Sequence, residues 1–193
     1  MADDGEQRRA IIDAATGLFS RFGLEKTTME DIAKAARKGK SSLYYYFTSK
    51  EAVYAEVIRN EIAGLKSTIA AAIAEENDPC STLRSFVTAR LRYLSETAEQ
   101  YTCIRDEFLR HYEFISALTV EYSDWEIQTL KAIVETGCEQ GVFEVRDADT
   151  TSRALFFALK GLEYPWAVDL TAEEMERSVG ALVDLLLKGI RKT

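Results

Sequence analysis

Apolar residues recur every three to four positions along nearly the whole chain, which is the spacing of amphipathic helices. In the first such segment, Ile11, Ala15, Leu18 and Phe22 would share one face of a helix. No segment of useful length alternates apolar and polar residues with the period of two that is typical of a strand. The pattern therefore predicts an all-α protein of about nine helices.

Capping residues and helix breakers divide this pattern into separate elements. Gly23 can take the left-handed conformation that would end the first helix near Phe22. Thr28 followed by Asp31 has capping-box spacing, which predicts that a short second helix begins there, and Gly39 would break that helix. The remaining helices are predicted at about 40–47, 49–74, 79–96, 100–117, 119–140, 148–163 and 172–190.

The charge is divided unevenly along the chain. The 193 residues are 47% apolar and 29% charged, as in ordinary globular proteins, and the net charge is −8. Residues 1–60 carry about +1 and residues 61–193 carry −9, while the segment 34–50 holds no acid. The basic residues of that segment are Lys34, Arg37, Lys38, Lys40 and Lys50. The overall acidity therefore does not exclude a nucleic-acid partner for the first part of the chain.

Few residues are suited to catalysis or to binding a metal. His111 is the single histidine, and the three cysteines lie too far apart for a metal-ligand spacing. No run of apolar residues approaches the 18 that a membrane helix requires. We therefore expect a cytoplasmic protein that is not an enzyme, has no cofactor and has no membrane partner.

The segment 28–47 has the form of a helix-turn-helix, because two short helices flank a short turn and the second opens in a basic, polar patch. With its flanking residues it resembles the TetR family of bacterial transcription regulators over about residues 8–58. The resemblance depends on Ala14, Ala15, Leu18, Phe19, Gly23, Thr27, Thr28, Ile32 and Ala33, and on the run Lys40, Ser41, Ser42, Leu43, Tyr44, Tyr45, Tyr46, Phe47, Ser49, Lys50 and Glu51.

This resemblance implies an organisation in two domains. Residues 1–48 would form a DNA-binding domain of three helices, and residues 49–193 a larger helical domain for ligand binding and dimerisation. The implied function is that of a homodimeric repressor, which binds a palindromic double-stranded operator and is released by a small apolar or aromatic inducer.

The start of the second helix of the motif has the chemistry that DNA contacts require. Lys40 supplies a cation there, and the serines that follow supply small hydroxyls. Three consecutive tyrosines would point about 100° apart, so they cannot all face one core. Thr28 and Lys50, each at a helix start, suit phosphate oxygens. The predicted DNA-binding residues are Thr28, Lys38, Lys40, Ser41, Ser42, Tyr44, Tyr45, Tyr46 and Lys50.

The turn of the motif departs from the family pattern. It reads Arg37, Lys38 and Gly39 where the family usually has a sequence like Gly, Val and Ser, so a lysine replaces the apolar residue. Either the stem of Lys38 packs while its ammonium group reaches solvent, or the turn is more open.

The second part of the chain is rich in aromatic residues, which could pack a core or line an apolar ligand pocket. The candidate pocket residues are Phe86, Arg90, Tyr93, Phe108, His111, Tyr112, Tyr122, Trp125 and Phe157. Small and apolar residues on the last two predicted helices would permit close helix packing between two copies of the chain. The candidate dimer residues are Ala154, Ala158, Leu162, Val179, Leu182, Val183 and Leu186.

Other functions are compatible with parts of this pattern. The chain could be a transcriptional activator, or a helical small-molecule-binding protein or enzyme that retains a three-helix head. The basic segment 34–50 argues against the small-molecule-binding protein and the enzyme.

Overall fold

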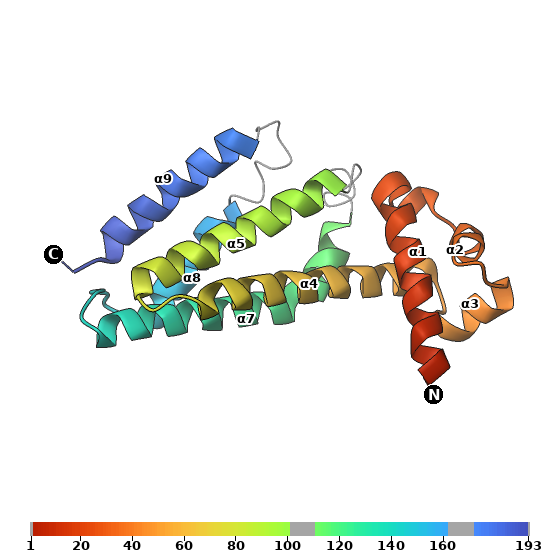
Figure 1. Cartoon of the computed structure of the whole chain (residues 1–193), viewed down its shortest axis with the longest axis horizontal. Helices are drawn as coiled ribbons and strands as arrows, with labels where there is room; N and C mark the ends of the chain where they lie inside the picture. Colours follow the sequence, from red (N-terminus) through yellow and green to blue (C-terminus); the bar gives the residue numbers. More distant parts are fainter. Residues whose placement is uncertain (1, 101–110, 162–171, 193) are drawn as a thin grey trace. The chain divides into compact units, whose positions relative to one another are not determined.

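The protein is all-α, as the apolar periodicity predicts. A computed structural model describes residues 2–100, 111–161 and 172–192, and within these ranges it contains eight helices and no strand (Figure 1). The helices are α1 (Ala2–Lys26), α2 (Met29–Ala35), α3 (Lys40–Tyr46), α4 (Lys50–Ala74), α5 (Pro79–Gln100), α7 (Tyr112–Glu139), α8 (Ala148–Gly161) and α9 (Ala172–Ile190). An isolated bridge pairs Phe143 with Arg191. None of the helices in the described ranges has both the length and the apolarity needed to cross a bilayer.

Most helix ends lie where the local sequence predicts them. The first helix leaves helical geometry at Gly23 (φ 76°, ψ 174°), and a further short turn continues to Lys26. Asp78 caps α5, because its Oδ1 accepts hydrogen bonds from the backbone N–H groups of Cys80 and Ser81 at 3.0 and 3.2 Å. Gly141 (φ 70°) follows the end of α7. These ends depend on neighbouring residues only, which is why the sequence predicts them.

Two predicted ends are wrong. The helix that begins at Pro79 continues to Gln100, beyond the predicted end near residue 96. The break predicted between 117 and 119 is absent, because α7 is continuous from Tyr112 to Glu139. Residues 112–136 contain neither glycine nor proline, so no backbone constraint interrupts that helix. The predicted helix at 100–117 falls largely on residues 101–110, outside the described part of the chain.

The chain divides into two compact units. The first unit comprises Met1–Ala63 and Thr97–Thr119, and the second comprises Gly64–Glu96 and Val120–Thr193. The first unit thus contains the whole of the predicted DNA-binding domain, 1–48.

The first unit has its own apolar core. The inner faces of α1 to α4 meet there, and Phe19 packs edge-on against Tyr54 with ring centroids 5.0 Å apart. The buried residues of this core are Ile11, Ile12, Ala15, Phe19, Leu24, Met29, Ile32, Ala33, Leu43, Phe47, Val53, Tyr54 and Val57. Apolar burial of this kind supplies the main free energy that holds the short helices α2 and α3 in place.

The second unit is a bundle whose helices approach closely at two glycines. A Cβ atom at Gly64 of α4 would lie 2.3 Å from the Tyr93 hydroxyl oxygen of α5. A Cβ atom at Gly137 of α7 would lie 2.0 Å from the ring of Phe143, in the segment that follows the helix. A side chain at Gly137 would therefore collide with the buried ring of Phe143, whereas one at Gly64 would require the hydroxyl end of Tyr93 to move.

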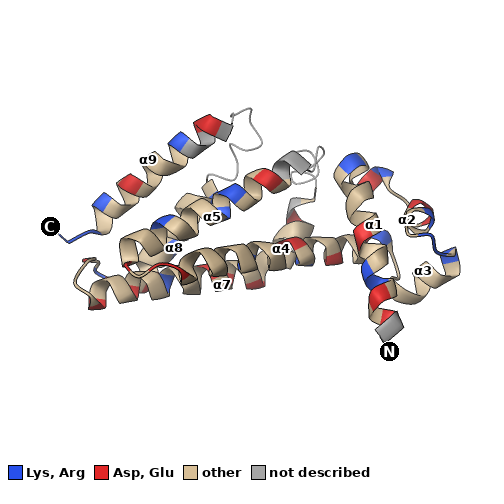
Figure 2. Cartoon of the chain, viewed as in Figure 1, with Lys and Arg blue, Asp and Glu red and all other residues tan. Residues whose placement is uncertain are grey.

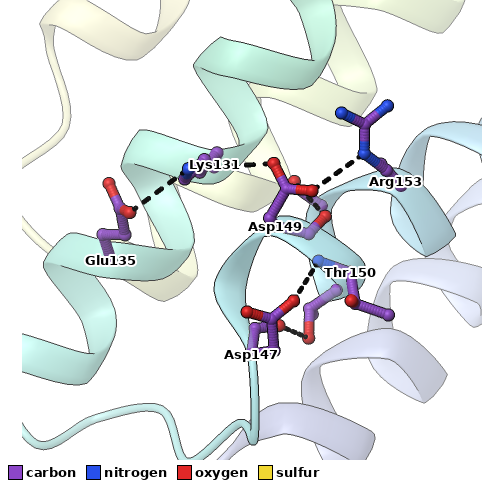
Figure 3. Close-up of polar contacts among 8 residues, drawn as sticks. Lys131, Glu135, Asp147, Asp149, Thr150 and Arg153 are labelled. Atoms are coloured by element: carbon purple, nitrogen blue, oxygen red, sulfur yellow. Dashed lines mark hydrogen bonds and ion pairs between the residues drawn. The ribbon is translucent and has the colours of Figure 1, made fainter.

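Partly exposed charged residues link α8 to α7 (Figure 3). Asp149 of α8 accepts a hydrogen bond from Arg153 Nε at 2.9 Å and lies 3.7 Å from Lys131 Nζ of α7. Asp147 caps α8 by accepting a hydrogen bond from the Thr150 backbone N–H at 2.6 Å. The cap sets where α8 begins, and the covered face of α8 holds the buried residues Leu155, Phe156 and Leu159.

Candidate nucleic-acid interface

Packing and a side-chain cap together position α2. Its inner face is buried through Met29, Ile32 and Ala33. The predicted capping box is present: Thr28 Oγ1 accepts from the Asp31 backbone N–H at 3.2 Å, and Asp31 Oδ2 accepts from the Thr28 backbone N–H at 3.0 Å. The Thr28 hydroxyl also donates to Asp31 Oδ2 at 2.6 Å. These hydrogen bonds from Thr28 lower the pKa of the Asp31 carboxyl, which therefore stays ionised near the positive end of the helix.

The turn between α2 and α3 is closed by a Schellman motif. The backbone N–H of Arg37 donates to the Lys34 carbonyl at 3.1 Å, and that of Lys38 donates to the Ala33 carbonyl at 2.9 Å. Arg37 occupies the left-handed position of the motif with φ 54°, where glycine is the usual residue. The glycine of the family pattern thus has a conformational reason, and this chain meets the same geometry with a strained residue.

Replacing Arg37 with glycine should therefore stabilise the protein. Relief of the left-handed strain, less the extra chain entropy of glycine, is worth about 0.5–1 kcal/mol in free energy of unfolding. Urea denaturation of the wild type and of the Arg37→Gly and Arg37→Ala variants measures this free energy of unfolding. Alanine removes the same charge but keeps the strain, so it should not stabilise, and equal effects of the two variants would contradict the assignment.

One side of α3 exposes polar and aromatic groups, and its other side packs against the apolar core. Leu43 is fully buried, whereas Tyr44 and Tyr45 are 47% and 77% exposed. Lys40 and Ser41 at the start of the helix are exposed, and the N-cap residue Gly39 provides no side-chain hydrogen bond there. The predicted divergence of the tyrosines is thus confirmed, and the exposed ones have hydroxyls available to a partner.

Basic residues gather at the turn that leads into α3 (Figure 2). Lys34 and Arg37 are exposed. Lys40 lies 3.6 Å from Glu30, but both side chains are largely exposed, at 62% and 79%. An exposed pair of this kind contributes little, so Lys40 can exchange Glu30 for a phosphate at small cost.

Several other predicted DNA-binding residues also have partners within the chain. Lys50 Nζ donates to the backbone carbonyls of Leu24 at 2.8 Å and Glu25 at 3.1 Å, which ties the end of α1 to the start of α4. Lys38 Nζ contacts Gln7 Oε1, and its side chain is half-buried. The half-buried side chain fits the packed stem of the first alternative, but the ammonium group, which that alternative places in solvent, contacts Gln7. A phosphate at Thr28 would compete with Asp31 for the hydroxyl hydrogen.

Sequence reasoning missed the first turns of α1. Tyr46 donates its hydroxyl hydrogen to Asp4 Oδ1 at 2.7 Å. Arg8 pairs with Glu56 of α4 at 2.7 Å and lies 5.1 Å above the ring of Phe47. Burial would raise the pKa of Glu56, but the hydrogen bonds and charges of Arg8 and Arg59 lower it overall. The four-residue spacing of Asp4 and Arg8 could have suggested a helix here. It could not have revealed that these two residues contact Tyr46 and Glu56.

The candidate pocket residues do not form one group. Phe86 and Arg90 of α5 and Tyr122 of α7 are buried in the second unit. There Arg90 Nε donates to Glu126 of α7, and neither side chain is exposed. Tyr93 and Trp125 are half-buried in the same unit.

The other candidates lie elsewhere. His111 belongs to the first unit, and Phe157 is 68% exposed on α8 rather than enclosed. Phe108 and the side chain of Tyr112 lie outside the described part of the structure.

The candidate dimer residues divide between the two sides of α8 and α9. Val179 and Val183 are buried within the chain's own second unit, so they are not free to form an interface. Leu182, Leu186 and Ala158 are half-buried, and Ala154 is exposed. Leu162 lies outside the described residues.

The exposed side of these helices carries two large apolar residues that the sequence did not assign to it. Leu185 of α9 is 66% exposed, and Phe157 of α8 is 68% exposed. We use the name outer α8–α9 face for the exposed and half-buried residues Ala154 and Phe157 of α8 and Leu182, Leu185 and Leu186 of α9.

Comparison with known proteins gives a consistent picture. A family model described as "Bacterial regulatory proteins, tetR family" matches residues 11–57. The probable acrEF/envCD operon repressor of Escherichia coli K12 is 25% identical over 193 residues, covering 94% of this chain and 85% of that protein. The transcriptional repressor KstR2 of Rhodococcus jostii is 29% identical over 137 residues, covering 68% and 67%. The crystal structure of the regulator PfmR from Thermus thermophilus is 29% identical, with a TM-score of 0.65 over 94% and 99% of the chains.

Proposed function

This chain belongs to the TetR family of bacterial transcription regulators, and from that premise we propose that it is a homodimeric repressor that binds a palindromic operator. The proposal is carried by α3, which stands on an apolar core and exposes Lys40, Ser41, Tyr44 and Tyr45. Repression, rather than activation, is supported by the two relatives that are named repressors. Since a transcription regulator works at the chromosome, we place the protein in the cytoplasm and assign it no catalysis.

In this proposal α3 is the recognition helix in the major groove. The hydroxyls of Ser41 and Ser42 are short and flexible enough to reach base edges, and Lys40 provides a cation for a phosphate or a guanine. Tyr44 and Tyr45 would contact phosphates or the methyl groups of thymine. The exposed Lys34 and Arg37 would add charge to the contact with the DNA backbone.

The outer α8–α9 face is the proposed dimer interface. A second copy of the chain could cover the exposed Leu185 and Phe157, and small residues such as Ala154 would let a second pair of helices approach. In a two-fold dimer that binds a palindromic operator, the two copies of α3 would meet successive major grooves, which lie about 34–36 Å apart.

The second unit would also hold the inducer. Its buried aromatic residues suit a small apolar or aromatic ligand. Such a ligand relieves repression by its preference for the conformation that does not bind DNA, which typically lowers operator affinity about 5–150-fold. Titration of lipophilic compounds against the protein–operator complex tests this part of the proposal, and release by none of a broad panel would contradict it.

The test of DNA binding is the salt dependence of affinity for a preferred duplex. Each lysine that neutralises a phosphate adds about 0.9 to the slope of log affinity against log salt concentration. Lys40→Ala should therefore weaken binding and reduce the slope by about 1, measured by fluorescence anisotropy. Lys192→Ala removes the same charge from an exposed position in the second unit. It should change neither the affinity nor the slope.

If the wild-type protein prefers no duplex over random DNA at moderate salt, the proposed repressor function is wrong. Equal salt-dependence slopes for the Lys40→Ala variant and the wild type would show that Lys40 does not contact the DNA.

A further inference from the structure

The first turns of α1 are bound to the helix-turn-helix at several points. Asp4 accepts a hydrogen bond from Tyr46 of α3, Gln7 contacts Lys38 of the turn, and Arg8 pairs with Glu56 of α4. Asp4 therefore meets Tyr46 from a helix that has two further contacts, one with the turn and one with α4.

Tyr46 in turn contacts the exposed Tyr45 of α3. Its ring lies edge-on to that of Tyr45, with centroids 5.1 Å apart and an interplanar angle of 89°. Tyr45 is 77% exposed. Asp4 thus binds the hydroxyl group of Tyr46, and the ring of Tyr45 packs against the ring of Tyr46.

We propose that Asp4 is a positioning residue for operator recognition, which sets the orientation of Tyr45 through Tyr46. The inference rests on the DNA-binding function proposed above. Asp4 carries a negative charge, so a direct contact with a phosphate is unfavourable, and its role is exerted through the tyrosine pair. A hydrogen-bonded Tyr46 restricts the rotamers of both rings before DNA arrives, so less conformational entropy is lost when Tyr45 meets the groove.

The charge and the hydrogen bond of Asp4 have separable effects. The charge repels any DNA, so its removal should raise affinity for all sequences alike. The hydrogen bond orders the ring pair, so its removal should reduce discrimination between the operator and a duplex with one altered base pair. One hydrogen bond corresponds to a loss of discrimination of about 2–10-fold.

The experiment measures this discrimination ratio for full-length variants against the duplex that the wild type prefers. Asp4→Ala removes the acceptor, Tyr46→Phe removes the donor, and each should lower the ratio by about 2–10-fold. The double variant should lose no more than either single one, because both break one contact. Asp4→Asn keeps an oxygen acceptor without the charge and should retain the wild-type ratio.

Glu6→Ala is the matched control, since it removes an exposed acid from the same helix turns and should leave the ratio unchanged. A wild-type ratio in Asp4→Ala, or additive losses in the double variant, would overturn the role of Asp4. A wild type without any discrimination would instead reject the DNA-binding function itself, so the two failures are distinguishable.

Discussion

Replacing Arg90 with methionine is expected to lower the free energy of unfolding by about 3–5 kcal/mol. Arg90 and Glu126 are fully buried in the second unit, where they pair with each other. Methionine fills a similar space but removes the guanidinium group that pairs with the buried Glu126 carboxylate. The loss comes from breaking this buried ion pair, and urea denaturation monitored by circular dichroism measures it.

Two further variants separate burial from pairing. The double variant Arg90→Met, Glu126→Leu removes both charges and should recover most of the lost stability. Arg84→Met breaks a second pair on α5, in which Arg84 binds Asp184 at 2.7 Å, but both side chains of that pair are about half exposed. It should change stability little, because solvent already screens the pair. An Arg90→Met variant as stable as Arg84→Met would contradict the description of the core.

The second large effect is expected from Leu185→Glu in the outer α8–α9 face. A glutamate at this position would bury a charge between two copies of α9 and so favour monomers. A monomer binds one half-site only and loses the effective concentration that links the two heads, which is worth about 10²–10⁴-fold in operator affinity. Light scattering at micromolar concentration and operator titration measure the two consequences.

Val120→Glu is the matched control for this variant. Val120 is also an exposed aliphatic residue, 56% accessible, but it lies on α7. Its substitution should leave both the dimer and operator binding intact. A wild type that is monomeric at micromolar concentration, or a Leu185→Glu variant that binds as tightly as the wild type, would exclude the proposed interface.

Local chemistry made part of the fold predictable. Gly23, Thr28, Gly141 and the Asp78–Pro79 pair each determine a helix end through their own backbone or side-chain preferences, and the structure has the ends there. The family-like run in α3 likewise identified the exposed tyrosines. Such features depend on residues a few positions apart, which a sequence displays directly.

Features that depend on distant partners were not predictable. Val183 and Leu186 lie three positions apart on the apolar stripe of α9, and only packing decides that the first is buried and the second half-buried. The contact of Tyr46 with Asp4 joins residues 42 positions apart, and no local pattern reveals it. The pairing of Arg90 with Glu126 is hidden for the same reason, since each residue alone resembles a solvated charge.

Selection of bound duplexes from a random pool tests the central claim most directly. The account predicts enrichment of one sequence with two inverted half-sites whose centres lie about one helical turn, or a multiple of it, apart. That spacing matches two copies of α3 related by a two-fold axis. A pool that stays random after repeated rounds, or an enriched site without inverted symmetry, would contradict the account.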